Sequence, residues 1–353
     1  MDVTQLLTDA VKKRASDVFI IAGMPVTYKI HESFDPRDEK ILKPNDTSAL
    51  VTQIYHLANE RDINQAIELG DDDFSITIPG LSRFRVNVYK QRSSLAAVIR
   101  VIRFELPNPE EVGIPGVVME LASRKKGLVL VTGTAGSGKS TTLACLIDRI
   151  NKTRSEHIVT LEDPLEYLHK HALSIISQRE VLTDTESYVK ALRASLRQAP
   201  DVVLLGEMRD HETISVAMTA AETGHLVFST LHTVGAANTI DRIIDAFPAN
   251  QQSQIRVQLS MVLQAVVSQQ LVPTTDSKIA PAFEIMIVNN AVRNLIREAK
   301  IHQIDSVIHS SASEGMMTMD SSLINLYKSG LISDKIAISY SANQELMAKK
   351  IVQ

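Results

Sequence analysis

The spacing of apolar residues changes part-way along this chain of 353 residues and divides it into two regions. In the first region, apolar residues at helical intervals predict helices at 4–14 and 47–69. Alternating and β-rich runs predict strands at 17–22, 74–78, 83–89 and 96–104, with a hairpin around Pro79-Gly80. We therefore expect a small α/β domain over residues 1–104.

A segment rich in proline and glycine separates the two regions. Residues 106–116 contain three prolines and two glycines, and we interpret residues 105–122 as a linker. Beyond it, short apolar runs alternate with helical segments, which is typical of a buried parallel sheet. These runs lie at 128–132, 157–161, 202–205 and 226–230. The second predicted domain is residues 123–353.

Two further parts of the second domain are predicted from local signals. A helix is expected over 184–199, because Thr183 and Glu186 have the spacing of a capping box and Pro200 stops it. Its basic residues Lys190, Arg193 and Arg197 favour a solvated helix face. Beyond Pro248 the pattern is mostly helical, with a possible strand at 283–288.

The composition argues against several classes of function. The formal net charge is −4 and aromatic residues make up 4% of the chain, without any Trp, so neither bulk charge nor base stacking favours nucleic-acid binding. The single cysteine, Cys145, excludes an internal disulfide framework and a cysteine-clustered zinc site. No apolar run approaches the ~20 residues that span a bilayer, and a cytoplasmic protein is expected.

A phosphate-binding loop is the most specific motif. Residues 133–140 fit G-x-x-x-x-G-K-[ST], directly after the strand at 128–132 and at the start of a helix at 141–150. Backbone N–H groups of such a loop surround phosphate oxygens. Lys139 would reach the β- and γ-phosphates, and the Ser140 hydroxyl would bind Mg²⁺. The predicted nucleotide-binding residues are Gly133, Thr134, Ala135, Gly136, Ser137, Gly138, Lys139, Ser140 and Thr141.

The segment after this helix bears on the choice of purine. Residues 151–154, Asn-Lys-Thr-Arg, superficially resemble the guanine-reading Asn-Lys-x-Asp, but Arg154 stands where the carboxylate belongs. ATP is therefore the predicted nucleotide.

Acidic residues follow two of the predicted strands. The run 202–207 resembles a Walker B strand, although Gly206 occupies the usual position of the metal-binding Asp, so Glu207 becomes the candidate general base. Glu162 and Glu166, after the strand at 157–161, could share Mg²⁺ and water positioning with Glu207. A solvated acidic loop remains the alternative for each segment.

Two histidines flank the strand at 226–230. His225 and His232 are seven residues apart, so in a regular strand they face opposite sides and do not form a metal pair. His232, at the carboxyl end, is the candidate sensor of the γ-phosphate. A structural role is expected for His225, and Cys145 is expected in the core.

Together these motifs resemble the secretion ATPase superfamily and, within it, the type IV pilus retraction ATPases. The resemblance covers nearly the whole chain. Its most specific piece is the segment 291–300, Ala-Val-Arg-Asn-Leu-Ile-Arg-Glu-Ala-Lys, which is similar to a C-terminal motif tied to pilus retraction and is extended by residues 315–320. The other pieces are the phosphate-binding loop, the acidic segment 162–166, the Walker B segment 204–210 and the histidine segment 220–233.

The resemblance implies a homohexamer whose subunits have a PAS-like N-terminal domain and a RecA-like P-loop ATPase domain with a helical C-terminal extension. Arg83, Arg85 and Arg100 would approach the phosphates from the N-terminal domain. The implied partners are an inner-membrane pilus platform protein and, as a possibility, a second retraction ATPase. The implied location is peripheral, at the cytoplasmic face of the inner membrane.

Several alternatives stay open. Inside the class they are an accessory retraction ATPase and a pilus-assembly or type II secretion ATPase. The latter often carries an extra N-terminal domain and a four-cysteine zinc site, and with a single cysteine in this sequence we expect the assembly role less. Outside the class they are a nucleotide-switched scaffold and a DNA-translocating ring. Scarce aromatic residues and the acidic balance disfavour the ring.

Overall fold

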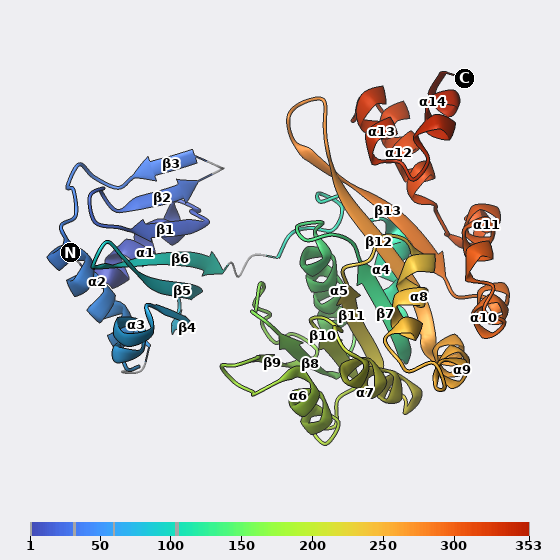
Figure 1. Cartoon of the computed structure of the whole chain (residues 1–353), viewed down its shortest axis with the longest axis horizontal. Helices are drawn as coiled ribbons and strands as arrows, with labels where there is room; N and C mark the ends of the chain where they lie inside the picture. The colour runs from blue at the N-terminus through green and yellow to red at the C-terminus, as the bar shows by residue number, and fades with distance from the viewer. Residues whose placement is uncertain (1, 31–32, 59–60, 103–105, 353) are drawn as a thin grey trace. The chain divides into compact units, whose positions relative to one another are not determined.

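The computed structural model describes residues 2–30, 33–58, 61–102 and 106–352. Those up to 102 form one compact unit, and those from 106 onward form most of a second (Figure 1). Each unit has its own sheet and its own hydrophobic core, so each is described separately.

The first unit is an antiparallel sheet covered by helices. Its strand order is β3-β2-β1-β6-β5-β4, and α2 lies against β6. The strands are β1 (Asp17–Ile20), β2 (Thr27–Ile30), β3 (Ser33–Pro36), β4 (Asp71–Ile78), β5 (Ser82–Gln91) and β6 (Ser94–Ile102); the helices are α1 (Val3–Lys12), α2 (Pro44–Leu57) and α3 (Asn64–Leu69). Leu7, Val18, Ile54 and Phe84 are fully buried in its core.

The sequence predicted most of this unit. The hairpin of β4 and β5 is confirmed, with Ile78 opposite Ser82. The prediction of one helix over 47–69 is wrong: α2 and α3 are separate, and residues 59–60 between them lie outside the described part. Strands β2 and β3 were not predicted, because both are short and β3 is largely exposed. The predicted strand 96–104 corresponds to β6, and its residues 103–104 lie outside the described part.

The second unit is a seven-stranded sheet with order β13-β12-β7-β11-β10-β8-β9, parallel except for β13. Its strands are β7 (Gly127–Thr132), β8 (His157–Glu162), β9 (Ile175–Glu180), β10 (Val202–Leu205), β11 (Leu226–Leu231), β12 (Leu263–Pro273) and β13 (Ile279–Ile287). Alternate residues of one strand belong to different cores: Leu128 and Leu130 of β7 pack with α6–α9, whereas Val129 and Val131 pack with α4 and α5. Both faces are therefore covered, as predicted for a parallel sheet.

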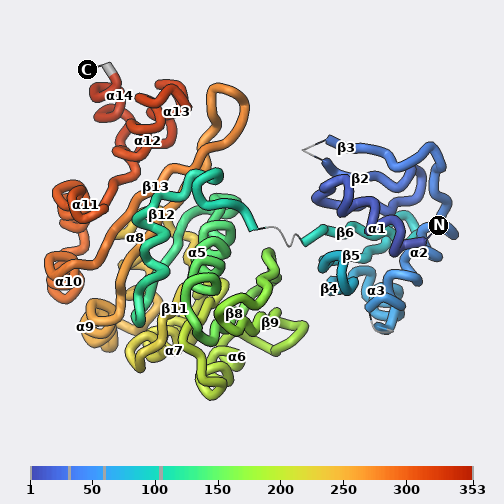
Figure 2. The backbone as a smooth tube through the Cα atoms, turned by 180° about the vertical axis from the view of Figure 1, so that it is seen from behind, coloured from blue at the N-terminus to red at the C-terminus, as the bar shows by residue number. Residues whose placement is uncertain are grey.

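The helices of this unit fall into two groups along the chain. The sheet-covering helices are α4 (Gly116–Glu120), α5 (Lys139–Thr153), α6 (Tyr188–Ser195), α7 (His211–Glu222), α8 (Ala236–Asp245) and α9 (Gln252–Val262). The C-terminal helices, which follow β13 and are seen from behind in Figure 2, are α10 (Asn290–Arg297), α11 (Ile304–Ser310), α12 (Met319–Lys328), α13 (Asp334–Tyr340) and α14 (Gln344–Val352). The α/β class with a largely parallel sheet and a helical C-terminal part is confirmed.

One prediction about this unit is wrong in detail, and two strands were missed. Helix α6 begins at Tyr188 rather than at 184, because Ser187 accepts a hydrogen bond from the Lys190 N–H and caps it, while Thr183 donates to Glu180 instead. Beyond Pro248 the chain is mostly helical and the possible strand at 283–288 corresponds to β13, as predicted, but β12, its antiparallel partner, was not predicted. Strand β9 was not predicted.

The segment interpreted as a linker also has structured residues. Residues 106–115 contain no regular helix or strand, but α4 begins at Gly116. Ile114, Val118 and Leu121 are buried in the core beneath α5. The second unit's core thus includes residues from 114 onward.

Candidate functional site

The predicted catalytic segments leave the sheet at one edge, because β7, β11, β10 and β8 are parallel neighbours. Backbone hydrogen bonds continue their pairing beyond the strand ends. The Gly133 N–H donates to the Leu231 carbonyl at 3.3 Å, and the Gly206 N–H donates to the Leu161 carbonyl at 2.7 Å. The phosphate-binding loop and the acidic and histidine segments therefore begin side by side, where parallel sheets commonly bind ligands.

The loop from 133 to 138 lies directly on β12. Gly133 has φ +140°, and a Cβ there would lie 2.2 Å from the carbonyl oxygen of Gln269. A Cβ at Gly138, whose φ is +88°, would lie 2.7 Å from Nε2 of the same glutamine. Thr142 of α5 donates to Oε1 of Gln269 at 2.8 Å. Gln269 thus supports the loop from below, a residue that the sequence motif does not reveal.

Lys139 lies inside the loop and is only 7% exposed. Its Nζ donates to the carbonyl oxygens of Gly133 at 2.9 Å and Thr134 at 2.8 Å. Ser140 and Thr141 follow in the first turn of α5, whose N–H groups face the loop. The Ser137 hydroxyl is buried without a hydrogen-bond partner among the described residues. A glycine cradle, a buried cation and an orphaned hydroxyl fit a phosphate group.

A cavity of about 430 Å³ adjoins the loop through Gly138, Thr141 and Thr142. The rest of its wall is mostly apolar. It includes Val112 and Ile114, which precede α4, with Leu271, Pro281, Leu326 and Leu331 from β12, β13, α12 and the turn after α12. An apolar cavity that adjoins a phosphate loop is a candidate site for the apolar face of a nucleotide base.

The segment that superficially resembled a guanine reader has a structural role. The buried Asn151 side chain donates to the Lys170 carbonyl and accepts from the Ala172 N–H. Arg154 donates to Glu156 and to the carbonyls of Ala122 and Arg124. Neither side chain is among the residues that line the cavity beside the loop.

Glu207 and His232 are brought together by β10 and β11. Nε2 of His232 lies 3.3 Å from Oε2 of Glu207, and the Arg209 guanidinium donates to Oε1 of the same carboxylate at 2.5 Å. The Glu207 side chain is 11% exposed, whereas Arg209 is 75% exposed. The hydrogen bond to Glu207 raises the pKa of Arg209, which stays charged. Arg209 is a site residue that sequence reasoning missed.

Two acidic candidates lie at the end of β8 and just after it. Glu162 ends β8, and its Oε1 lies 3.5 Å from Nε2 of Gln178. Glu166 is exposed, and its carboxylate makes no hydrogen bond or ion pair with the described residues. No cluster of three metal-ligating side chains occurs in the described ranges. This donor set fits Mg²⁺ held through Ser140, substrate phosphates and water, as Mg²⁺ usually is, rather than an all-protein cage.

The three candidate arginines lie on β5 and β6 of the first unit. Arg85 stands directly opposite Arg100, an arrangement of like charges that is unfavourable unless compensated. Each has a carboxylate partner: Arg85 pairs with Asp73 at 2.7 Å, and Arg100 pairs with Asp17 at 3.2 Å. Arg83 is half-buried two residues before Arg85.

The remaining candidates take structural positions. Nδ1 of His225 lies 2.9 Å from the Ala220 carbonyl, at the end of α7. On α6, Lys190 pairs with Glu186 and Arg193 pairs with Glu212, as expected for a solvated basic face. Cys145 is buried in the core, as predicted.

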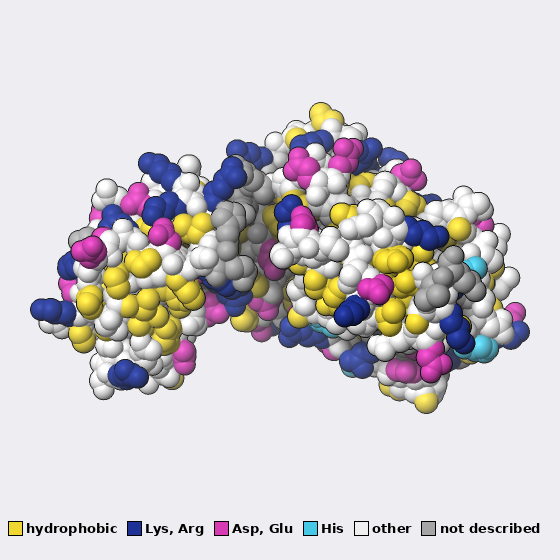
Figure 3. Space-filling view, turned by 90° about the horizontal axis from the view of Figure 1, so that it is seen from above, with side chains coloured by type: hydrophobic (Ala, Val, Ile, Leu, Met, Phe, Trp, Pro, Cys, Tyr) yellow, Lys and Arg dark blue, Asp and Glu magenta, His cyan; other side chains and the backbone are white. Residues whose placement is uncertain are grey.

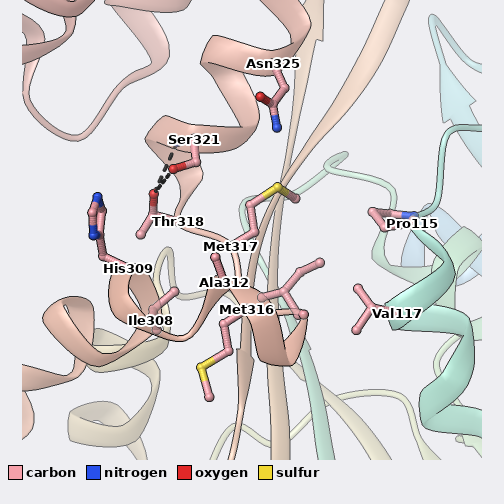
Figure 4. A pocket seen from close by; sticks show the side chains of 12 residues that line it. Pro115, Val117, Ile308, His309, Ala312, Met316, Met317, Thr318, Ser321 and Asn325 are labelled. Atoms are coloured by element: carbon pink, nitrogen blue, oxygen red, sulfur yellow. Dashed lines mark hydrogen bonds between the residues drawn. The ribbon is translucent and has the colours of Figure 1, made fainter.

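The C-terminal segment 315–320 packs against the start of α4 (Figure 4). A Cβ at Gly315 would lie 2.7 Å from Cγ2 of Val117, so this close approach needs glycine. Met316 and Met317 contribute apolar surface to a hollow of about 370 Å³ beside it. Thr318 then caps α12 by accepting from the Ser321 N–H.

A phosphate loop between a central parallel strand and a helix, with Glu207 and a histidine at the same edge, defines the class of P-loop nucleoside triphosphatases. The chain belongs to the family of type II/IV secretion system proteins, whose profile matches residues 1–333. None of the helices in the described ranges is long and apolar enough to cross a membrane.

The relatives are similar over nearly the full chain. The chain is 45% identical over 334 residues, 94% of this chain and 96% of the relative, to the type IV pilus retraction ATPase PilT of Pseudomonas aeruginosa. It is 40% identical over 353 residues, 99% of this chain and 92% of the relative, to the type IV pilus ATPase PilU of the same organism. The crystal structure of the pilus retraction motor PilT with bound ADP has a TM-score of 0.90 and 45% identity, and covers 98% of both chains.

Proposed function

We propose that this chain is an ATP-hydrolysing motor that powers type IV pilus retraction. One observation carries the proposal. The phosphate loop with Lys139 follows β7, and Glu207 and His232 contact each other at the same end of the sheet. The similarity to PilT supports the pilus role.

The chemistry follows from the positions of these side chains. The phosphate loop binds the β- and γ-phosphates through its N–H groups, and Lys139 exchanges its two carbonyl partners for phosphate oxygens. Glu207 accepts the proton of the attacking water. His232, which contacts Glu207, senses the γ-phosphate. Mg²⁺ held by Ser140, with water-mediated help from Glu162, Glu166 or Glu207, would neutralise the charge that develops on the phosphates.

The assembly is part of the same proposal. A homohexamer would let Arg83, Arg85 or Arg100 of one subunit approach the phosphates, and an arginine in such a position contributes ~10³–10⁵ in rate. The proposed partner is an inner-membrane pilus platform protein, and we propose that the motor lies at the cytoplasmic face of the inner membrane. The similarity to PilU keeps an accessory retraction role as the second candidate.

Three variants test the catalytic assignment. Lys139→Ala is expected to lose ATP binding. Glu207→Gln is expected to keep ATP bound and to lose ~10²–10⁴ in turnover, because the amide cannot take the proton. Glu212→Gln is the matched control, since this carboxylate is half-exposed and paired with Arg193 away from the loop. Full turnover by Glu207→Gln would remove Glu207 as the base.

Two further assays separate the alternatives. Deletion of the gene is expected to give hyperpiliated cells that do not twitch, whereas loss of pili would indicate an assembly role. ATPase assays with DNA test the translocase alternative, and strong stimulation by DNA would contradict the pilus proposal. On each unit, basic and acidic side chains are interspersed on the face that Figure 3 shows, which favours no stimulation.

A further inference from the structure

The end of β10 lacks the carboxylate that usually follows a Walker B strand, and a tyrosine hydroxyl fills the space. A Cβ at Gly206 would lie 2.8 Å from Oη of Tyr188 and 3.2 Å from the Leu161 carbonyl oxygen. Tyr188 is the first residue of α6, where the Ser187 cap fixes the start of the helix. No side chain fits at position 206 while the Tyr188 hydroxyl stays in this place.

The Cβ position of Gly206, 2.8 Å from this hydroxyl, also lies 3.4 Å from Cα of Glu162, and Glu207 is the next residue in the chain, so the hydroxyl lies beside the backbone of two acidic residues. Burial raises the pKa of Tyr188 well above its ordinary value, and the negative charges of Asp163, Glu207 and Glu162 raise it further. The phenol is therefore neutral throughout the physiological range and keeps its proton for donation. No hydrogen bond joins it to another described residue, so this donor is available to a water molecule at the sheet edge.

We propose that Tyr188 is a positioning residue for ATP hydrolysis, whose hydroxyl stands in the place of the missing Walker B side chain and orients a water between Glu162 and Glu207. The inference rests on the proposed ATPase function. An aspartate at 206 would place a third carboxylate beside these two, and repulsion between like charges disfavours ionisation of all three. A neutral donor orients water there without adding charge.

The simplest competing explanation is that Tyr188 only packs against the sheet, which partly buried aromatic residues commonly do. Tyr188→Phe separates the two explanations, because it keeps the ring and removes only the hydroxyl. The expected result is a loss in kcat of about tenfold, the usual effect of one hydrogen bond, with the KM for ATP and the affinity for ADP changed less than about twofold.

Tyr327→Phe, in helix α12 outside the sheet edge, is the matched control and is expected to leave all these quantities unchanged. Equal kcat for the wild type and Tyr188→Phe would overturn the inference. A loss of kcat that comes with a parallel loss of ADP affinity or of melting temperature would assign Tyr188 to packing and would also overturn it. If the wild type itself does not hydrolyse ATP, the proposed function fails instead.

A double-mutant cycle tests the contact with Gly206. Gly206→Ala is expected to lower kcat about tenfold in the wild type, because the new methyl group displaces the hydroxyl. In the Tyr188→Phe background the same change meets no hydroxyl and is expected to cost less than about threefold. Independent, multiplicative losses in the two backgrounds would show that Gly206 does not act through Tyr188.

Discussion

Gly133→Ala adds one methyl group to the phosphate loop at a position where the structure leaves no space for it. The added Cβ would lie 2.2 Å from the backbone oxygen of Gln269 and 2.6 Å from the Ser137 hydroxyl, and φ is +140°. Gly136 is the matched control in the same loop, because its φ of +75° also disfavours alanine but nothing lies within 4 Å of its Cβ. The pair separates the steric overlap from the cost of positive φ.

The two changes differ in their expected free energy. Alanine at Gly136 costs about 1–2 kcal/mol for the left-handed backbone alone. Alanine at Gly133 costs about 1–3 kcal/mol for a conformation nearly restricted to glycine, and overpacking against a strand that cannot rotate away adds about 1–3 kcal/mol. Taken at the midpoints of these ranges, Gly133→Ala is expected to be the more destabilising by about 2.5 kcal/mol, or roughly 5–10 °C in melting temperature for a domain of this size.

Differential scanning calorimetry with and without ADP and Mg²⁺ measures this difference, because the transition that nucleotide raises is that of the nucleotide-binding unit. Gly136→Ala is expected to keep the ADP-dependent rise, whereas Gly133→Ala is expected to lose it, since the loop must move off Gln269. Equal melting temperatures for the two variants, with equal responses to ADP, would refute this account of the loop.

Two further predictions concern groups outside the catalytic edge. The buried Asp72 carboxylate accepts from Tyr55 and twice from Arg61; burial raises its pKa, but these hydrogen bonds outweigh burial and lower it overall. Its contribution to stability is therefore present above the unfolded pKa of about 4 and is lost as the pH falls through the lower folded value. The free energy of unfolding, measured by denaturant titration at a series of acidic pH values, should therefore fall less steeply with pH in Asp72→Asn than in the wild type. Burial raises the pKa of Cys145 to about 11, with Asp148 adding to the effect, so a thiol reagent at pH 8 should label the unfolded chain but not the native one; rapid native labelling would contradict the buried position.

The phosphate loop could be predicted because its signal is contiguous in the sequence, whereas its support could not. Gln269 lies far along the chain from Gly133, and only the pairing of β12 with β7 brings them together. The same residue explains why β12 was misread as part of a helical region. Ser268, Gln269 and Gln270 interrupt the apolar run that marks a buried strand, and Gln269 is polar because it faces the loop.

The rest of the candidate site also contains both predicted and unpredicted residues. Glu207 and His232 were predicted from the strands that they follow, and parallel pairing brings them within contact distance. Arg209 and Tyr188 were not predicted, since neither belongs to a motif whose chemistry sequence spacing reveals. The predicted cap of α6 failed because Thr183 and Ser187 are both plausible caps locally, and Thr183 donates instead to Glu180, three residues earlier.

The groups assigned to catalysis are already engaged by the chain itself. Lys139 donates to two loop carbonyls, and both oxygens of Glu207 have partners, Arg209 and His232. Nucleotide binding must therefore exchange these contacts rather than simply add new ones, and the exchange costs far less than exposing an unpaired buried charge. Because Arg209 is mostly exposed, its release from Glu207 costs little, so we expect a small movement at the end of β10 to be enough to free the proposed base. Glu207 directly follows Gly206, where an added Cβ would lie 2.8 Å from the Tyr188 hydroxyl, so we expect such a movement to depend on the position of α6.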